Sequence, residues 1–271
     1  MADNRDEVHA ALTDLYATGG GLHHAPLELS VYFDEDTLVR AAKIYRSLQG
    51  EVATDGKAVV VTAGPPGAGK TSALDTLNLK GFRRIDPDVV KDILLDDAER
   101  HGLLKYRHDH TLPDGRPVGV RELGSQVHQF STYTADIIRS MSLTAGENVV
   151  IEGTLSWPQL ADVYITDLFN ANYEGVEVID VEAPFDVALE RIRERWWSDR
   201  IKEPMGGRFV SDDVLKGYYA DGLGESVCAH NAAILAERAA DELGHGILRR
   251  FDVETDGSVK QTSRTDFGSM S

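Results

Sequence analysis

A glycine-rich octapeptide, GPPGAGKT at residues 64–71, limits the possible folds of this chain more than any other segment. It matches the phosphate-binding loop pattern G-x-x-x-x-G-K-[S/T] at every fixed position. A β-branched apolar run at residues 58–62 precedes it, and a helical pattern from Lys70 to about Lys80 follows it. Such a short apolar run is typical of a strand buried on both faces, so these segments predict a parallel α/β sheet.

The loop residues suit the phosphates of a nucleoside triphosphate. Its glycines allow successive backbone N–H groups to surround an anion at a helix N-terminus. Lys70 is expected to reach the β- and γ-phosphates, and the Thr71 hydroxyl to bind the Mg²⁺ that bridges them. A plain glycine turn is the alternative reading, whereas a dinucleotide-binding loop would have a different glycine spacing. The predicted nucleotide-binding residues are Gly64, Pro65, Pro66, Gly67, Ala68, Gly69, Lys70, Thr71 and Ser72.

Strand and helix patterns alternate beyond this loop. Helical stretches separate the apolar runs, for example at residues 126–143 and 186–197. This alternation predicts a parallel sheet with right-handed crossovers and helices on both faces. The further strand candidates are residues 82–86, 148–153 and 176–183.

The two ends of the chain differ from this pattern. Residues 1–50 are predicted to form a helical extension, interrupted by glycines at 19–21 and by Pro26. This extension could cover a cleft, mediate dimerisation or simply pack on the core, and we expect packing. The remaining residues, 51–271, are predicted to be the core domain, ending in a β-hairpin around Asp256 and Gly257.

Composition restricts the class of partner and compartment. The 271 residues carry a formal net charge of −17, which disfavours a general DNA or RNA binder. The single cysteine, Cys228, cannot form an internal disulfide, and the acidic N-terminus does not resemble a secretory signal. No apolar run approaches the roughly 18 residues of a membrane span. We therefore expect a cytoplasmic protein that binds neither nucleic acid nor membrane.

Two acidic motifs follow predicted strands. Asp86 and Asp88 come after the second strand, at the sheet edge that also carries the glycine-rich loop. A carboxylate there can accept a proton from an attacking hydroxyl, although Asp88 is also a good helix N-cap, and the two aspartates can divide these roles. Glu152 follows the strand at 149–151 and is expected near Mg²⁺ or a substrate hydroxyl, unless it is a solvated acid at the strand end.

A cationic segment near residues 191–210 stands out in this acidic chain. Helical spacing places Arg191 and Arg195 on one flank of an apolar stripe, and Arg193 and Arg200 on the other. Arginines on a mobile lid can neutralise charge on a transferred phosphoryl group. The alternative is a surface helix whose arginines pair with neighbouring glutamates.

Together, GPPGAGKT, IDPDVVK, VVIEGT and the R…GGR segment resemble the zeta toxin family of small P-loop kinases, over about residues 58–220. The resemblance implies a P-loop kinase core and ATP-dependent phosphorylation of the 3′-hydroxyl of UDP-N-acetylglucosamine. It also implies a cognate antitoxin, which in that family blocks the ATP site with a helix.

Site residues follow from the same resemblance. Lys70 and Thr71 would hold ATP and Mg²⁺, and Asp88 would be the catalytic base. Arg208 of the GGR motif and Arg195 would stabilise charge, with Arg191 or Arg193 as alternatives to Arg195. The implied substrate-binding residues are Asp88, Glu152, Thr154 and Asp136.

Two parts of the chain have no counterpart in this resemblance, namely residues 1–50 and residues 103–124. The second segment lies between the expected base and the expected sugar-binding helix, so the acceptor stays open. The alternatives are a kinase for another small hydroxylated metabolite or antibiotic, and a nucleotide-dependent binding module without turnover.

Overall fold

The computed structural model describes residues 4–219, 225–254 and 257–268. The chain divides into two compact units that are interleaved along the sequence. The first unit comprises Met1–Tyr45, Pro87–Ala135 and Ile192–Ser211, and the second comprises Arg46–Asp86, Asp136–Arg191 and Asp212–Ser271. The division into an extension at 1–50 and a core domain at 51–271 stays a prediction.

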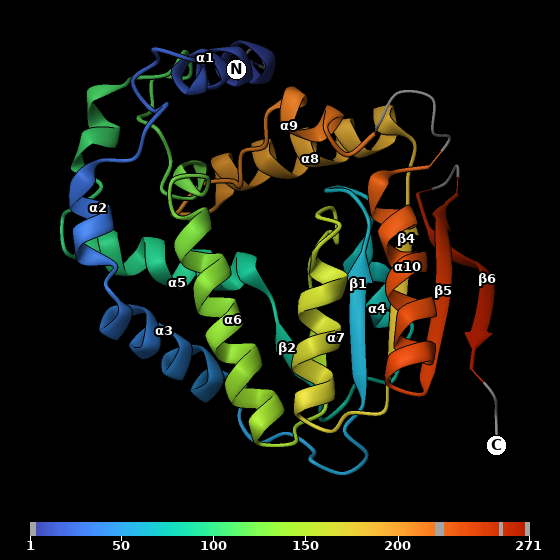
Figure 1. Ribbon diagram of the computed structural model, residues 1–271. Coiled ribbons are helices and arrows are strands. Elements are labelled where there is room, and N and C mark those ends of the chain that lie inside the picture. Colours follow the sequence, from blue (N-terminus) through green and yellow to red (C-terminus); the bar gives the residue numbers. More distant parts are fainter. Residues whose placement is uncertain (1–3, 220–224, 255–256, 269–271) are drawn as a thin grey trace. The chain divides into compact units, whose positions relative to one another are not determined.

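The second unit contains a six-stranded sheet with the order β2-β3-β1-β4-β5-β6 (Figure 1). Strands β1 to β5 are all parallel to one another, and β6 pairs antiparallel with β5. The predicted parallel sheet and C-terminal hairpin are confirmed. The strands are β1 (Val59–Ala63), β2 (Arg83–Ile85), β3 (Val149–Ile151), β4 (Gly175–Glu182), β5 (His245–Val253) and β6 (Val259–Phe267).

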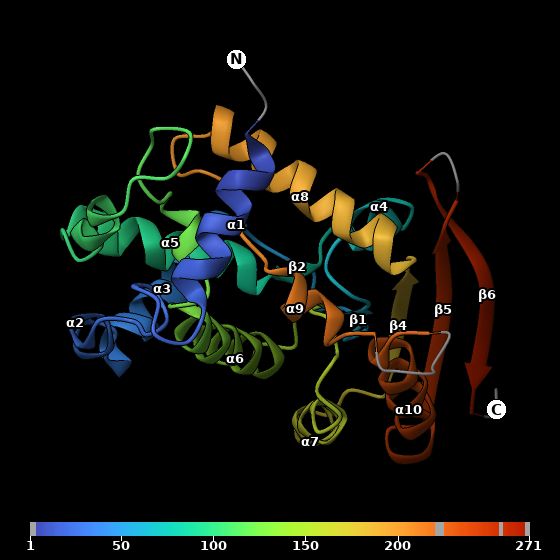
Figure 2. The ribbon, with the colours of Figure 1, turned by 90° about the horizontal axis from the view of Figure 1, so that it is seen from above.

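Helices cover both faces of this sheet, as predicted. Helices α7 (Leu160–Asn170) and α10 (Val227–Glu242) lie on one face, and α4 (Lys70–Asp75) lies on the other (Figure 2). All five residues of β1 are buried, because this strand lies between β3 and β4 and both of its faces are covered. The glycine-rich loop therefore starts at the carboxyl edge of the central strand.

Two details differ from the predictions. Helix α4 ends at Asp75 instead of continuing to about Lys80, because the Thr76 hydroxyl and backbone N–H both bind the Ala73 carbonyl (2.7 and 3.1 Å). Strand β6 extends beyond the predicted hairpin as far as Phe267. Asp256 of the predicted turn lies outside the described residues.

The first unit is helical. It contains α1 (Arg5–Tyr16), α2 (Leu27–Tyr32), α5 (Pro87–Arg100) and the 3-10 turns η1 (Lys105–Asp109) and η2 (Arg121–Leu123). Val8 and Leu12 of α1 are fully buried, as expected for an N-terminal helix that packs on a core. The remaining helices are α3 (Glu35–Leu48), α6 (His128–Thr144), α8 (Phe185–Lys202) and α9 (Asp212–Lys216). Within the described ranges, no helix has the length and apolar character needed to cross a membrane.

Candidate active site

The glycine-rich loop connects β1 to α4 in the second unit. Gly64, Gly67 and Gly69 all have positive φ angles, between 81° and 127°. A Cβ atom on Gly64 would lie 2.2 Å from the Val181 carbonyl oxygen, so only glycine fits at the start of the loop. This backbone has the compact turn that a phosphate-binding loop needs.

Lys70 and Thr71 begin helix α4 at the end of this loop. The Lys70 ammonium donates to the backbone carbonyls of Gly64 (2.7 Å) and Pro65 (2.9 Å), so the side chain bends back across the loop. Thr71 and Ser72 are exposed in the first helical turn. The residues predicted to hold a triphosphate are therefore brought together in one loop and helix start.

Arg191 of the cationic segment contacts this loop. Its Nη1 donates to the Gly67 carbonyl (3.4 Å), and its Nη2 to the Gly257 carbonyl in the β5–β6 connection (2.6 Å). Arg193 instead lies 4.0 Å from the Asp6 carboxylate in the first unit. Arg191 thus lies beside the loop within the second unit, and which arginine faces the phosphates stays a prediction.

Glu152 and Thr154 follow strand β3 at the same carboxyl edge. The Glu152 carboxylate accepts from Arg84 Nε (2.7 Å), and its side chain is 12% exposed. It is therefore ion-paired and largely buried, which differs from the solvated acid considered as the alternative. The Thr154 carbonyl accepts from the Gly64 N–H (3.1 Å), so the VVIEGT motif contacts the glycine-rich loop directly.

Asp136 lies on helix α6 and pairs with Arg139 (2.6 Å). Arg139 also binds Asp167 of α7 (2.9 Å) and packs over the Tyr164 ring, so it links the two helices. The Asp136 side chain remains 47% exposed. Its assignment to sugar binding stays a prediction.

Asp88 lies in the first turn of helix α5, in the first unit. The helix begins at Pro87, so Asp88 is inside the helix and is not its N-cap. Its carboxylate pairs with Lys91 (3.0 Å), and 46% of its side chain is exposed. Burial raises the pKa of this carboxyl, but the charges of Lys91, Arg208 and Arg195 outweigh burial and hold the pKa below its usual value. Asp88 is therefore ionised at neutral pH.

Arg208 lies in the same unit and contacts the start of α5. Its Nη2 donates to the Asp92 carboxylate (2.6 Å) and to the Asp88 backbone carbonyl (3.2 Å). A Cβ atom on the preceding Gly207 would lie 2.0 Å from the Trp196 carbonyl oxygen, which explains the glycine in the GGR motif. Asp88 and Arg208, which were predicted separately from two motifs, are thus neighbours.

Two partners of this group, Asp92 and Arg121, were not predicted from the sequence. Asp92 lies one helical turn after Asp88 on α5, a spacing that could have identified it. Arg121 binds Asp92 through two nitrogens (3.0 and 3.1 Å). It comes from the 103–124 segment, and no local pattern could have paired it with Asp92.

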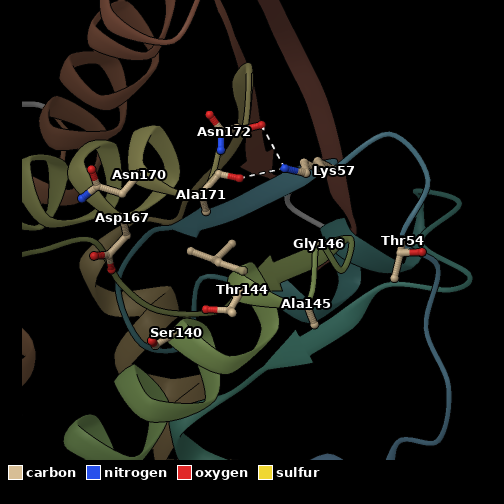
Figure 3. Close-up of a pocket in the computed structure, with 11 residues that line it drawn as sticks. Thr54, Lys57, Ser140, Thr144, Ala145, Gly146, Asp167, Asn170, Ala171 and Asn172 are labelled. Atoms are coloured by element: carbon tan, nitrogen blue, oxygen red, sulfur yellow. Dashed lines mark hydrogen bonds between the residues drawn. The ribbon is translucent and has the colours of Figure 1, made fainter.

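A pocket of about 680 Å³ lies in the second unit at the amino ends of the strands, at the opposite edge of the sheet from the glycine-rich loop (Figure 3). Lys57 Nζ there donates to the carbonyls of Ala171 (2.8 Å) and Asn172 (3.3 Å), which follow the end of α7. These bonds cap a helix C-terminus. Because the glycine-rich loop is at the carboxyl edge, this pocket is not part of the candidate active site.

A sequence model described as Zeta toxin matches residues 43–240. No curated protein matches the chain.

Solved structures share the fold. The complex of AvrRxo1-ORF1 and AvrRxo1-ORF2 with sulphate ions has a TM-score of 0.52 and 20% identity, over 87% of this chain and 67% of that one. The same complex with ATP has a TM-score of 0.52 and 19% identity, over 88% and 67%. A structure of the PezAT chromosomal toxin–antitoxin system of Streptococcus pneumoniae has a TM-score of 0.54 and 14% identity, over 85% and 81%. At these identities the likeness concerns the fold.

Proposed function

The chain belongs to the zeta toxin family, and from this premise we propose that it is an ATP-dependent kinase acting on a nucleotide-sugar. The proposed acceptor is a sugar hydroxyl of UDP-N-acetylglucosamine. Membership in a kinase family and the intact loop from Gly64 to Thr71 support nucleotide-dependent phosphoryl transfer. The AvrRxo1 structure with ATP supports the choice of nucleotide.

The loop residues would bind the triphosphate. Lys70 would move its ammonium from the loop carbonyls to the β- and γ-phosphates, since a charged phosphate is the stronger acceptor. The exposed Thr71 hydroxyl fits Mg²⁺, an ion that keeps several waters and takes further ligands from phosphate oxygens. No cluster of three or more acidic, histidine or cysteine side chains suited to a metal occurs in the described residues. Bound Mg²⁺ would neutralise charge on the phosphates.

Asp88 is the proposed base, and the observation that carries the proposal is its half-exposed carboxylate beside Lys91, with Arg208 bonded to its backbone carbonyl. In the transfer, the acceptor oxygen bonds to the γ-phosphorus while the bond between that phosphorus and the β–γ bridging oxygen breaks and ADP leaves. The hydroxyl proton passes to Asp88, which must therefore be a carboxylate beforehand. The pKa of Asp88, lowered by Lys91, Arg208 and Arg195 against the effect of burial, meets this requirement.

Other residues have proposed roles around this step. Arg208 and Arg195 would stabilise charge on the transferred group, and Arg191 would support the loop on which the phosphates rest. Glu152, Thr154 and Asp136 are the proposed contacts for the acceptor.

The acceptor can be tested directly. Purified protein is incubated with Mg²⁺, ATP and UDP-N-acetylglucosamine, and the sugar nucleotide is analysed by mass spectrometry. The proposal predicts a product heavier by one phosphate. ATP consumption without this product, but with a phosphorylated compound from a metabolite extract, would move the proposal to another small hydroxylated acceptor. ATP binding with no product from any extract would favour a binding module.

A cognate antitoxin is the proposed protein partner. The family and the likeness of the fold to a structure from the PezAT toxin–antitoxin system support this proposal. Co-expression with the product of a neighbouring reading frame should give a stable complex with reduced phosphoryl transfer. Unchanged transfer in the presence of every neighbouring product would contradict it.

A further inference from the structure

The Asp92 carboxylate lies between two arginines in the first unit. Arg121 approaches with Nε on Oδ1 (3.0 Å) and Nη2 on Oδ2 (3.1 Å), and Arg208 places Nη2 on Oδ2 (2.6 Å). The side chains of Asp92 and Arg121 are both 21% exposed. One negative charge thus faces two positive charges, so the cluster retains a net positive charge.

In the part of the chain that the structure describes, the contacts of Arg208 involve Nη2 of its guanidinium, which leaves Nη1 available for another hydrogen bond. Nη2 makes both bonds of the group, to Asp92 and to the Asp88 carbonyl. Nε is buried and has no hydrogen-bond partner among the described residues. The hydrogen bonds that Arg208 makes within the described residues all come from Nη2, and none comes from Nη1. The guanidinium is therefore anchored through one amino group, and Nη1 can donate to an anion while that anchor remains in place.

Arg121 is itself firmly held. Its backbone N–H donates to the Met205 carbonyl (2.9 Å), and its Nη1 lies 3.5 Å from the Gly206 carbonyl. The next residue, Glu122, is fully buried and accepts from Trp196 Nε1 (2.8 Å) and Arg200 Nη1 (2.6 Å). Arg121 thus contacts both Asp92 and the short segment that carries Arg208.

We propose that Arg121 is a positioning residue for phosphoryl transfer, which acts through Asp92 to fix the orientation of the Arg208 guanidinium. The bidentate bond from Arg121 fixes the plane of the Asp92 carboxylate, and that carboxylate fixes the direction of Arg208. The 103–124 segment then contributes to the transfer step as well as to the fold. This inference rests on the proposed kinase function.

The first test is a kinetic comparison with Mg²⁺, ATP and UDP-N-acetylglucosamine. Arg121→Met should lower kcat by about 10- to 100-fold, because small displacements of a charge-stabilising group have effects of this size. KM for ATP should stay within about threefold, since Arg208 acts on the transition state. Arg121→Lys should remain impaired, because an ammonium cannot make the bidentate bond. A normal kcat in Arg121→Met would overturn the proposal.

Arg107→Met is a matched control, because Arg107 lies in the same 103–124 segment and also pairs with a carboxylate of α5. Arg107 of η1 pairs with Glu99 of α5 (2.7 Å) but contacts neither Asp92 nor Arg208. Arg107→Met should lower the melting temperature about as much as Arg121→Met and leave kcat unchanged. Equal kcat losses in both variants would mean that Arg121 has only a structural role.

A double-mutant cycle tests whether Arg121 acts through Arg208. In an Arg208→Ala background, adding Arg121→Met should change kcat by less than about twofold, because the group being positioned is already absent. Multiplied losses would refute the coupling. Full transfer by Arg208→Ala would refute the inference and leave the kinase proposal intact.

A second readout requires no turnover and therefore separates the two proposals. In protein with ¹³C,¹⁵N-labelled arginine, the guanidinium signal of Arg208 is identified by its loss in Arg208→Lys. Its Nη protons should exchange slowly with solvent in the wild type and faster in Arg121→Met, but slowly in Arg107→Met. If the wild type transfers no phosphate yet shows this pattern, the proposed function fails and the positioning contact stands. An Arg208 signal unchanged by Arg121→Met would contradict the contact.

Discussion

Replacing Asp180 by asparagine should change the pH dependence of stability. Asp180 lies on β4, its side chain is fully buried, and among the described residues neither carboxylate oxygen has a hydrogen-bond partner. Arg250 Nε lies 3.7 Å from its Oδ2. Burial, reinforced by the charge of Glu182 and only partly offset by Arg250, raises the pKa of Asp180 from 3.8 to about 7.

The direction of the effect follows from proton binding. Between pH 4 and 7 the folded protein keeps the Asp180 proton that the unfolded chain releases, so the free energy of unfolding falls as pH rises. A shift of about three pKa units corresponds to about 4 kcal/mol at 1.36 kcal/mol per unit. An asparagine side chain cannot titrate, so Asp180→Asn should not lose this stability. The free energy of unfolding of the variant minus that of the wild type should therefore increase by about 4 kcal/mol from pH 4 to pH 8.

Urea unfolding of both proteins at intervals between pH 4 and pH 8 measures this difference. Asp213→Asn, at a side chain that is 86% exposed, is the control and should follow the wild type. Two curves for the wild type and Asp180→Asn that stay parallel across this range would refute the reasoning, because the buried carboxyl would then not titrate there.

Three further substitutions test separate parts of the structure. Lys70→Met should weaken binding of a fluorescent ATP analogue about 10- to 100-fold, since a charged hydrogen bond to phosphate is lost; unchanged affinity would contradict the loop assignment. Gly207→Ala should lower the unfolding free energy by about 1–3 kcal/mol, because its Cβ would collide with a carbonyl of α8; calorimetry showing no change would contradict this contact. Arg200→Met should cost about 3–5 kcal/mol in urea unfolding, since it leaves the buried carboxylates of Asp114 and Glu122 without their cation; a loss below about 1 kcal/mol would be inconsistent with the buried pair.

Local patterns predicted the second unit well. The apolar run before the glycine-rich loop is β1, and the carboxylate of VVIEGT follows β3 at the same sheet edge. Helical spacing also separated Arg191 from Arg193 and Arg200, because a position on a helix surface depends only on sequence distance. Each of these features depends on a few residues that are close together in the chain, so the sequence alone was enough to predict it.

Long-range ion pairs could not be predicted in this way. Arg208 and Asp92 are 116 residues apart, and Arg121 and Asp92 are 29 residues apart. The charge of Arg200 gave no sign that it is buried, because burial depends on which carboxylates the fold brings to it. The predicted length of α4 was wrong for a different, local reason, since the hydroxyl and backbone N–H of Thr76 both bind the Ala73 carbonyl and end the helix there.

Single-turnover transfer from γ-labelled ATP by Asp88→Asn tests the central claim most directly. ATP binding should be retained, while transfer to UDP-N-acetylglucosamine should fall at least about 100-fold, as expected when a general base is lost. Asp96→Asn, which changes an exposed carboxylate on the same helix, should transfer at the wild-type rate. Transfer by Asp88→Asn at the wild-type rate would contradict the account, because the proton of the acceptor would then have to leave by another group.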